Sequence, residues 1–267
     1  MQVKPTPPKS SSTYKLLNVD SNPKTVKNHA YGYLTGVLYL APADLASTPE
    51  LPINVCTMAH IAGCKDPCLN LAGRGKFNAT QAARIRKTVW FATDRQGFME
   101  QLAKDIEILA RRAAKRGLKP LVRLNGTSDI KWENIRFEYE FVNNKTREVT
   151  LFQLFPEVQF YDYTKMPSRA DNPEFPKNYD LTFSYSGVPE YQKYVNRAVF
   201  KGMRVAVVFD KKETVRSMVD NEAEFLGLPM VDGDDDDVRH LDPQGSVVAL
   251  YAKGPAKADV SGFVVRS

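Results

Sequence analysis

The stretch that decides the fold is the first clear strand, Tyr33–Leu40 (YLTGVLYL), which leads directly into the turn Ala41-Pro42-Ala43-Asp44. Six further short runs repeat this pattern, each ending in polar residues or glycine. Short apolar runs of this kind are typical of buried parallel strands. The six runs are Pro120–Leu124, Val158–Tyr161, Asp180–Phe183, Met203–Phe209, Pro229–Val231 and Val247–Tyr251.

Helices are expected between several of these strands. Over Asp94–Gly117 apolar residues recur at helical spacing, Asp94 is a suitable N-cap and Gly117 ends the helix. A second helix is expected from Asn78, which has the capping-box offset to Gln81, to about Phe91, and a third over Tyr191–Lys201. Alternating strands and helices indicate an α/β fold.

Polar residues follow most of the strands, and this feature distinguishes two α/β architectures. A doubly wound sheet gathers such residues at one or two strand ends, whereas a β/α barrel does so at nearly all of them. We therefore expect a complete or partial β/α (TIM-like) barrel over residues 18–267, as a single domain. Residues Glu133–Phe155 are expected to form a β-hairpin insertion, and the Pro-, Ser- and Lys-rich start predicts a disordered arm over residues 1–17.

Composition and charge exclude several classes of protein. No apolar run approaches the roughly 20 residues of a membrane span, and the start has no hydrophobic core of a secretory signal. Three cysteines, an odd number, argue against a disulfide scaffold and for the reducing cytoplasm. The net charge of +6 permits an anionic partner. The most basic region, Arg74–Lys87, predicts either contact with a nucleotide or nucleic acid or a solvated helix face.

All three cysteines lie in one loop, residues 56–68, at Cys56, Cys64 and Cys68. Three thiolates can hold a 4Fe-4S cluster and leave its fourth iron open for a ligand. The same loop carries His60, so a Cys3His zinc site is the alternative. A third interpretation is that the cysteines bind no metal and are simply buried, as free cysteines often are. The residues alone leave all three interpretations open.

A barrel whose first strand leads into three cysteines resembles the radical S-adenosylmethionine enzymes, although the spacing of seven and three residues differs from their usual three and two. The resemblance implies that the open iron holds S-adenosylmethionine. It also implies that Asn125, Thr127 and Asp129 bind the methionine amino group and that Ser184 and Ser186 bind the ribose. Such residues also serve as turn and cap residues.

The segment Tyr161-Asp162-Tyr163-Thr164-Lys165 places a carboxylate and an amine at one strand end. If this end faces a pocket, burial and pairing would shift the pKa values of Asp162 and Lys165, and either could be the catalytic acid–base group. The alternative is a salt bridge at a strand edge.

The chain as a whole is similar to a family of tailed-bacteriophage proteins of unassigned activity, from about Asn18 to the C-terminus. This resemblance implies a viral origin and a host cytoplasm. We therefore expect an iron–sulfur, radical S-adenosylmethionine-like enzyme with an unknown substrate, for which a nucleotide is one option, and a host electron donor. The alternative is a non-catalytic phage accessory protein with a structural zinc site that binds a host protein or nucleic acid. The strings that carry the similarity are the cysteine motif with Leu69, Gly73-Arg74-Gly75, Arg123–Asp129, Phe160–Lys165, Asp232-Gly233-Asp234 and Lys253-Gly254.

Overall fold

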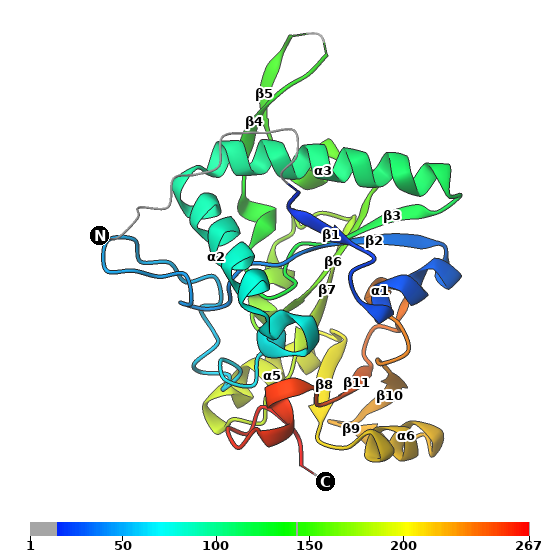
Figure 1. The fold of residues 1–267 in the computed structure, drawn as a ribbon. Helices are drawn as coiled ribbons and strands as arrows, with labels where there is room; N and C mark the ends of the chain where they lie inside the picture. The colour runs from blue at the N-terminus through cyan, green and yellow to red at the C-terminus, as the bar shows by residue number, and fades with distance from the viewer. Residues whose placement is uncertain (1–14, 143, 267) are drawn as a thin grey trace.

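A computed structural model describes residues 15–142 and 144–266 of the chain, and its centre is a nine-stranded mixed sheet (Figure 1). The strand order is β1-β2-β3-β6-β7-β8-β11-β10-β9. From β2 to β10 every neighbouring pair is parallel. The predicted strands are confirmed as β2 (Tyr33–Leu38), β3 (Lys119–Arg123), β6 (Gln159–Thr164), β7 (Tyr179–Ser184), β8 (Val205–Phe209), β10 (Leu228–Asp232) and β11 (Val247–Tyr251).

The two edges of the sheet are closed by short antiparallel strands, β1 (Leu17–Val19) on β2 and β9 (Glu224–Phe225) on β10. The expected arm over residues 1–17 is therefore too long, because Leu16 and Leu17 are buried. Their backbone N–H groups both donate to the buried carboxylate of Asp105, at 2.6 and 2.9 Å. The rest of the expected arm, residues 1–14, lies outside the described residues.

The three expected helices are present as α2 (Asn78–Thr93), α3 (Arg95–Lys115) and α5 (Gln192–Phe200). Asp94 caps α3 by accepting the N–H of Gly97 at 2.9 Å. The capping box expected at the start of α2 is wrong, because Gln81 donates to the carbonyls of Asn70 and Gly75 instead. The other helices are α1 (Pro23–Lys27), α4 (Leu151–Leu154) and α6 (Lys212–Asp220), and the 3-10 turns are η1 (Asn28–Tyr31), η2 (Leu69–Leu71), η3 (Gly73–Lys76), η4 (Trp132–Asn134), η5 (Pro167–Asp171), η6 (Pro189–Tyr191), η7 (Arg239–Leu241) and η8 (Gly254–Ala258).

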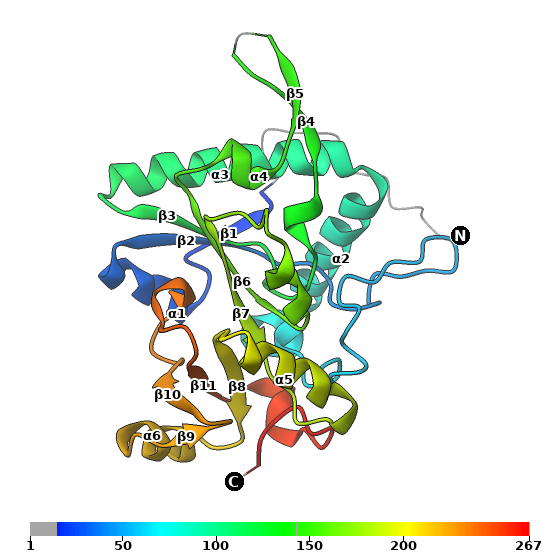
Figure 2. The ribbon, with the colours of Figure 1, turned by 180° about the vertical axis from the view of Figure 1, so that it is seen from behind.

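The expected hairpin insertion is also present. Strands β4 (Phe137–Glu140) and β5 (Thr146–Val149) pair antiparallel as a separate two-stranded sheet. The hairpin projects away from the rest of the molecule beyond α3 (Figures 1 and 2). It therefore adds no strand to the central sheet.

The two faces of the central sheet differ in chemistry. Because successive side chains in a strand point to opposite faces, residues such as Leu34, Val122 and Phe160 lie on one face, where they share the main core with the apolar residues of α3. On the other face, Tyr33 and Tyr161 pack with Leu121 and with Val238 from the segment that follows β10. We call this second face the polar face, because Thr35, Arg123, Tyr163 and Thr182 share its register.

The strand order bears on the expected architecture. The first five parallel strands, β2, β3, β6, β7 and β8, neighbour one another in chain order, whereas β11 lies between β8 and β10. Within the described residues no strand pairing joins β1 to β9. The fold is therefore mixed α/β, and its description as a complete or partial barrel stays a prediction.

Candidate functional site at the carboxyl ends of the parallel strands

The three cysteines lie together in the segment that connects β2 to α2. Cys64 and Cys68 both contribute to the raised pKa of Cys56, and Cys64 contributes to the raised pKa of Cys68. These effects indicate that the three thiols are near one another. All three are free thiols that are only partly exposed. The thiol of Cys56 donates to the carbonyl of Thr127, at 3.7 Å, in the segment that follows β3. The cysteine loop is thus placed at the carboxyl ends of the parallel strands.

Three hydrogen bonds from different parts of the chain hold the cysteine loop in place. The backbone N–H of Asp129, after β3, donates to the carbonyl of Val55 at 2.8 Å. The hydroxyl of Ser186, after β7, donates to the carbonyl of Ala62 at 2.7 Å. Near the C-terminus, the hydroxyl of Ser261 donates to the carbonyl of Gly63 at 2.8 Å. The segment is therefore fixed at Val55, just before Cys56, and at Ala62 and Gly63, just before Cys64.

Burial determines the protonation of these thiols. Desolvation raises the pKa of Cys56 to about 12, and it raises the pKa values of Cys64 and Cys68 as well. The free thiols are therefore protonated at neutral pH. Two cations oppose this effect, since Lys165 lowers the pKa of Cys64 and Arg84 lowers that of Cys68. A bound metal would convert the thiols to thiolates, because metal ligation deprotonates thiols.

Lys165, one of the two acid–base candidates, is a buried amine close enough to Cys64 to influence its pKa. It is 7 % exposed, and its Nζ donates to the carbonyls of Ser184 and Tyr185 at 3.0 and 2.7 Å. The ammonium also lies 4.5 Å from the ring centre of Phe263. Burial lowers the pKa of Lys165 to about 8, against the opposing influence of Cys64 and Asp129. A lysine in this state can give up a proton near neutral pH.

Asp129 is a buried carboxylate between the cysteine loop and the neighbouring strand. It accepts hydrogen bonds from the hydroxyl of Thr164 at 2.9 Å and from the backbone N–H of Lys165 at 2.7 Å. It also pairs with Arg169 at 3.2 Å, and Arg169 forms a second buried ion pair with Glu133 at 2.6 Å. Asp129 therefore ties the ends of β3 and β6 together beside the thiols.

Asn125 and Asp162, which the sequence offered as a ligand-binding and a catalytic residue, bond mainly to each other and to the protein interior. The carboxylate of Asp162 accepts from the backbone N–H of Asn125 at 2.7 Å and from the hydroxyl of Tyr179 at 2.6 Å. The side-chain oxygen of Asn125 accepts from Ser128, Ile130 and Trp132. Asp162 is completely buried and lies on the helix-covered face of β6, opposite to Tyr161 and Tyr163. Its role as an acid–base group stays a prediction.

Thr127, Ser184 and Ser186 lie next to the cysteine loop, and two of them are occupied in holding it. Thr127 donates to the carbonyl of Leu40 at 2.5 Å, and its own carbonyl accepts from Cys56. Ser186 bonds to Ala62, as described above. Ser184 is half-buried on the polar face, and its carbonyl accepts from Lys165. The sequence-based role of Ser184 in binding a ribose stays a prediction.

The sequence assigned no ligand-binding or catalytic role to Tyr39, Arg123 or Tyr163. It placed Arg84 only in the basic region Arg74–Lys87. Arg123 lies 4.6 Å from the ring centre of Tyr163 and pairs with Asp237 at 3.3 Å, and Arg84 lies 4.9 Å from the ring centre of Tyr39. Tyr39, Arg123 and Tyr163 are half-buried, so each presents part of its surface to solvent. Because successive side chains of a strand point to opposite faces, the sequence could have predicted that Arg123 and Tyr163 lie on the same face of the sheet. No local sequence pattern predicts that the side chain of Arg84 is buried.

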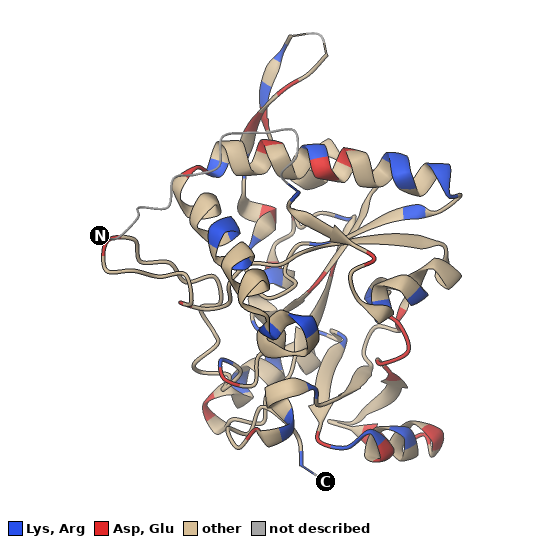
Figure 3. Ribbon diagram, viewed as in Figure 1, with Lys and Arg blue, Asp and Glu red and all other residues tan. Residues whose placement is uncertain are grey.

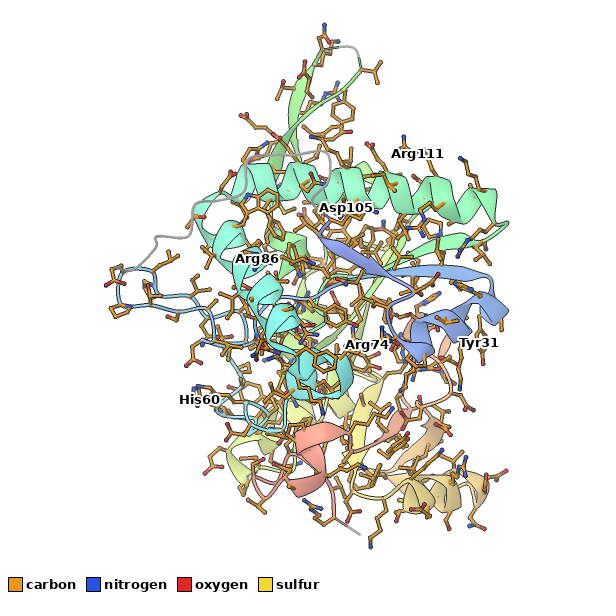
Figure 4. The ribbon with its side chains drawn as sticks, in the orientation of Figure 1. Tyr31, His60, Arg74, Arg86, Asp105 and Arg111 are labelled. Carbon is orange, nitrogen blue, oxygen red and sulfur yellow. The ribbon has the colours of Figure 1, made fainter. Side chains whose placement is uncertain are left out.

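His60, the fourth ligand of the zinc alternative, is exposed on the outer side of the loop (Figure 4). Among the described residues, no group of three or more His, Cys, Asp or Glu side chains is arranged to hold a metal ion. The side-chain types are those that ligate iron as thiolates, and the cations Lys165 and Arg84 act on Cys64 and Cys68, but the described positions of the three cysteines do not form a metal-binding group.

Figure 3 marks the Lys and Arg positions along the basic region Arg74–Lys87, and Figure 4 labels Arg74 and Arg86 in it. The side chains of this region are divided between the interior and the surface. Arg84 and Lys87 are buried, and Lys87 donates to the carbonyl of Leu16 at 2.6 Å. Arg86 is exposed and lines a groove of about 500 Å³ between β1, α2 and α3, which Lys15 and Arg112 also line. The surface cations of the groove are therefore contributed by α2, α3 and Lys15, which precedes β1, rather than by one sequence segment.

A model of the family Gene product 88 matches residues 15–267. The chain belongs to the Gene product 88 family. This membership is consistent with the expected bacteriophage protein family. No curated protein and no solved structure matches the chain. In the described ranges no helix has the length and apolar content to cross a membrane.

Proposed function

We propose that this member of the Gene product 88 family is an iron–sulfur protein in which Cys56, Cys64 and Cys68 hold a 4Fe-4S cluster. The observation that carries the proposal is the gathering of the three thiols at the carboxyl ends of a parallel sheet, where α/β enzymes place their active sites. A cluster with three thiolate ligands keeps one iron open for a ligand and can supply one electron to it. In this proposal the protein is a radical S-adenosylmethionine-like enzyme, and its sheet is a partial barrel.

In this proposal, different residues of the chain position the cysteine loop, hold a proton and bind the ligands. Asp129, Thr127 and Ser186 position the cysteine loop by the hydrogen bonds that they make to it or beside it. Lys165 holds or releases a proton next to Cys64. The polar face below the thiols, with Ser184, Arg123 and Tyr163, is the surface against which S-adenosylmethionine and the substrate lie.

The phage family supports a setting in the host cytoplasm, with a host protein as electron donor. The exposed cations of the groove between α2 and α3 support a nucleotide or nucleic acid as the second partner, because phosphate groups seek such surfaces. The accessory-protein alternative with structural zinc has less support, because its fourth ligand, His60, is exposed on the outer side of the loop.

The test is anaerobic purification followed by iron, sulfide and zinc analysis and a visible absorption spectrum. We expect iron and sulfide in the wild type, a severe loss of both in Cys64→Ala, and little change in His60→Ala, the matched control from the same loop. One zinc per chain without colour would refute the proposal. Equal loss of iron in the two variants would refute the ligand assignment and support the Cys3His site.

A further inference from the structure

The groove between β1, α2 and α3 lies apart from the strand-end site and has a volume of about 500 Å³. Arg86 of α2, Arg112 of α3 and Lys15, which precedes β1, line the groove, and all three are exposed. Of the described residues, Asp105 is the one carboxylate in its lining (Figure 4 labels Arg86 and Asp105). The groove therefore has an excess of positive charge.

The two buried charges that line the groove bind the protein's own backbone. Asp105 accepts the backbone N–H groups of Leu16 and Leu17 at 2.6 and 2.9 Å, and Lys87 donates to the carbonyl of Leu16 at 2.6 Å. The attraction of Asp105 also acts on Lys87 and opposes the lowering of its pKa by burial. These contacts fix the chain immediately after Lys15, and they leave neither buried charge to balance the exposed cations.

The exposed cations of the groove have no carboxylate partner within the chain. In the described ranges, no ion pair is formed by Lys15, Arg86 or Arg112, whereas Arg116, one turn further along α3, pairs with Asp20 at 3.2 Å. The net charge of the chain is +6, so part of the excess positive charge is gathered at this groove. An anion from outside the chain can pair with these three side chains at little desolvation cost, because they are exposed.

We propose that this groove binds the sugar–phosphate backbone of double-stranded nucleic acid, with Lys15, Arg86 and Arg112 each neutralising a phosphate. The inference rests on the nucleic-acid partner in the proposed function and does not involve the cluster. Exposed cations bind one phosphate weakly, and a polymer that meets several of them at once gains affinity by releasing its condensed counterions. Contacts to phosphate and sugar carry no sequence information, so binding is independent of sequence.

The lining of the groove favours a duplex over other anions. Within the described residues no aromatic side chain lines it, so it offers no ring on which an unpaired base could stack. A site for a small anion encloses its ligand, whereas the cations of this groove are exposed. Ile108, on the same helix as Arg112, also lines the groove and is 40 % exposed, which provides apolar contact for the sugars.

The test is the affinity of the full-length protein for a fluorescein-labelled DNA duplex of about 20 base pairs, measured by fluorescence anisotropy between about 50 and 200 mM salt. Each neutralised phosphate contributes about −0.9 to the slope of log K against log salt concentration. The groove variant, Lys15→Ala/Arg86→Ala/Arg112→Ala, should therefore bind more weakly, with a slope shallower by about 2.7. Arg86→Ala alone should make the slope shallower by about 0.9, which keeps the test decisive if the triple variant does not fold.

The matched control is Lys177→Ala/Lys193→Ala/Arg216→Ala, which removes the same charge from exposed positions outside the groove. Its affinity and slope should stay close to those of the wild type. Equal losses in the control and the groove variant would overturn the inference, because they would show a general effect of net charge.

The probe itself provides two further outcomes. Binding of the single strand, or of poly-glutamate of matched charge, as tightly as the duplex would overturn the choice of a duplex as the partner. A wild-type protein that binds no duplex would overturn the inference and leave the cysteine assignment intact. A wild-type protein that lacks iron but binds the duplex through these cations would support the inference and refute the iron–sulfur assignment alone.

Discussion

The buried carboxyl group of Asp162 should make the protein less stable as the pH rises, and this prediction can be worked out from its surroundings. Asp162 is completely buried, and desolvation raises its pKa from 3.8 to about 7, although Tyr179 and the backbone N–H of Asn125 oppose the shift by donating to it. Because the folded-state pKa is the higher one, the folded protein keeps a proton that the unfolded chain has lost. Stability is therefore greatest at low pH and is lost as the pH rises through the folded-state value.

The stability that Asp162 contributes depends on the width of the pH range in which it is protonated in the folded protein and ionised in the unfolded chain. Between about pH 5 and pH 7 the unfolded chain is ionised at this position and the folded protein is not. Two pKa units at 1.36 kcal/mol each correspond to roughly 3 kcal/mol of stability. Above about pH 8 both states are ionised, and no further change from this group is expected.

The perturbation is Asp162→Asn, which cannot titrate and so provides the reference. Equilibrium urea unfolding of the wild type and the variant at several pH values gives the difference in their free energies of unfolding, in which the other titrating groups cancel. We expect the wild type to lose roughly 3 kcal/mol relative to the variant between about pH 5 and pH 8. A difference that does not change with pH would show that Asp162 is ionised throughout, and the reasoning from burial would be refuted.

Two further predictions concern the framework of the site. Ser186→Ala removes the hydroxyl that donates to the buried carbonyl of Ala62, which should destabilise the cysteine loop by about 1–3 kcal/mol. Native-state alkylation of the cysteine thiols by iodoacetamide should therefore accelerate at least about fivefold. An unchanged rate would show that other contacts hold the loop. Arg169→Met removes the ion-pair partner of the buried carboxylates of Glu133 and Asp129. It should lower the free energy of unfolding, measured in urea, by about 3–5 kcal/mol. The control Arg197→Met removes a half-exposed pair and should cost under about 1 kcal/mol; equal losses would contradict the role of burial.

The strands and long helices could be predicted from the sequence because their signals are local. Runs such as Met203–Phe209 carry enough apolar, β-branched residues to indicate a buried strand, and Asp94 marks the start of α3 through a cap that involves only its near neighbours. The capping box at Asn78 failed for a tertiary reason, since the side chain of Gln81 found acceptors in the turn before the helix. Strand β1 was missed because three residues at an edge carry almost no periodic signal.

The site was predictable in its thiols and only partly in its surroundings. The cysteines share one loop, so their proximity could be read directly from the sequence. The bond from Ser186 to Ala62 joins residues 124 positions apart, and the inward turn of Arg84 depends on where Asn70 lies. Polar residues after strands were correctly located near the site, but whether a hydroxyl faces a ligand or holds a loop is decided by such long-range contacts.

The protonation of the three thiols bears on how the cysteine loop can be stable both without a cluster and with the proposed one. Three neighbouring thiolates would repel one another in a buried loop, and the raised pKa values show that the protein avoids this by keeping the thiols neutral. In the proposed iron–sulfur protein, loading the cluster would release thiol protons, so cluster binding would become more favourable as the pH rises. Lys165 and Arg84 reduce that cost on either side of the loop without pairing to the thiols in advance. The backbone carbonyls of Val55, Ala62 and Gly63 anchor this segment without using its sulfurs, so these contacts persist when the thiols change charge.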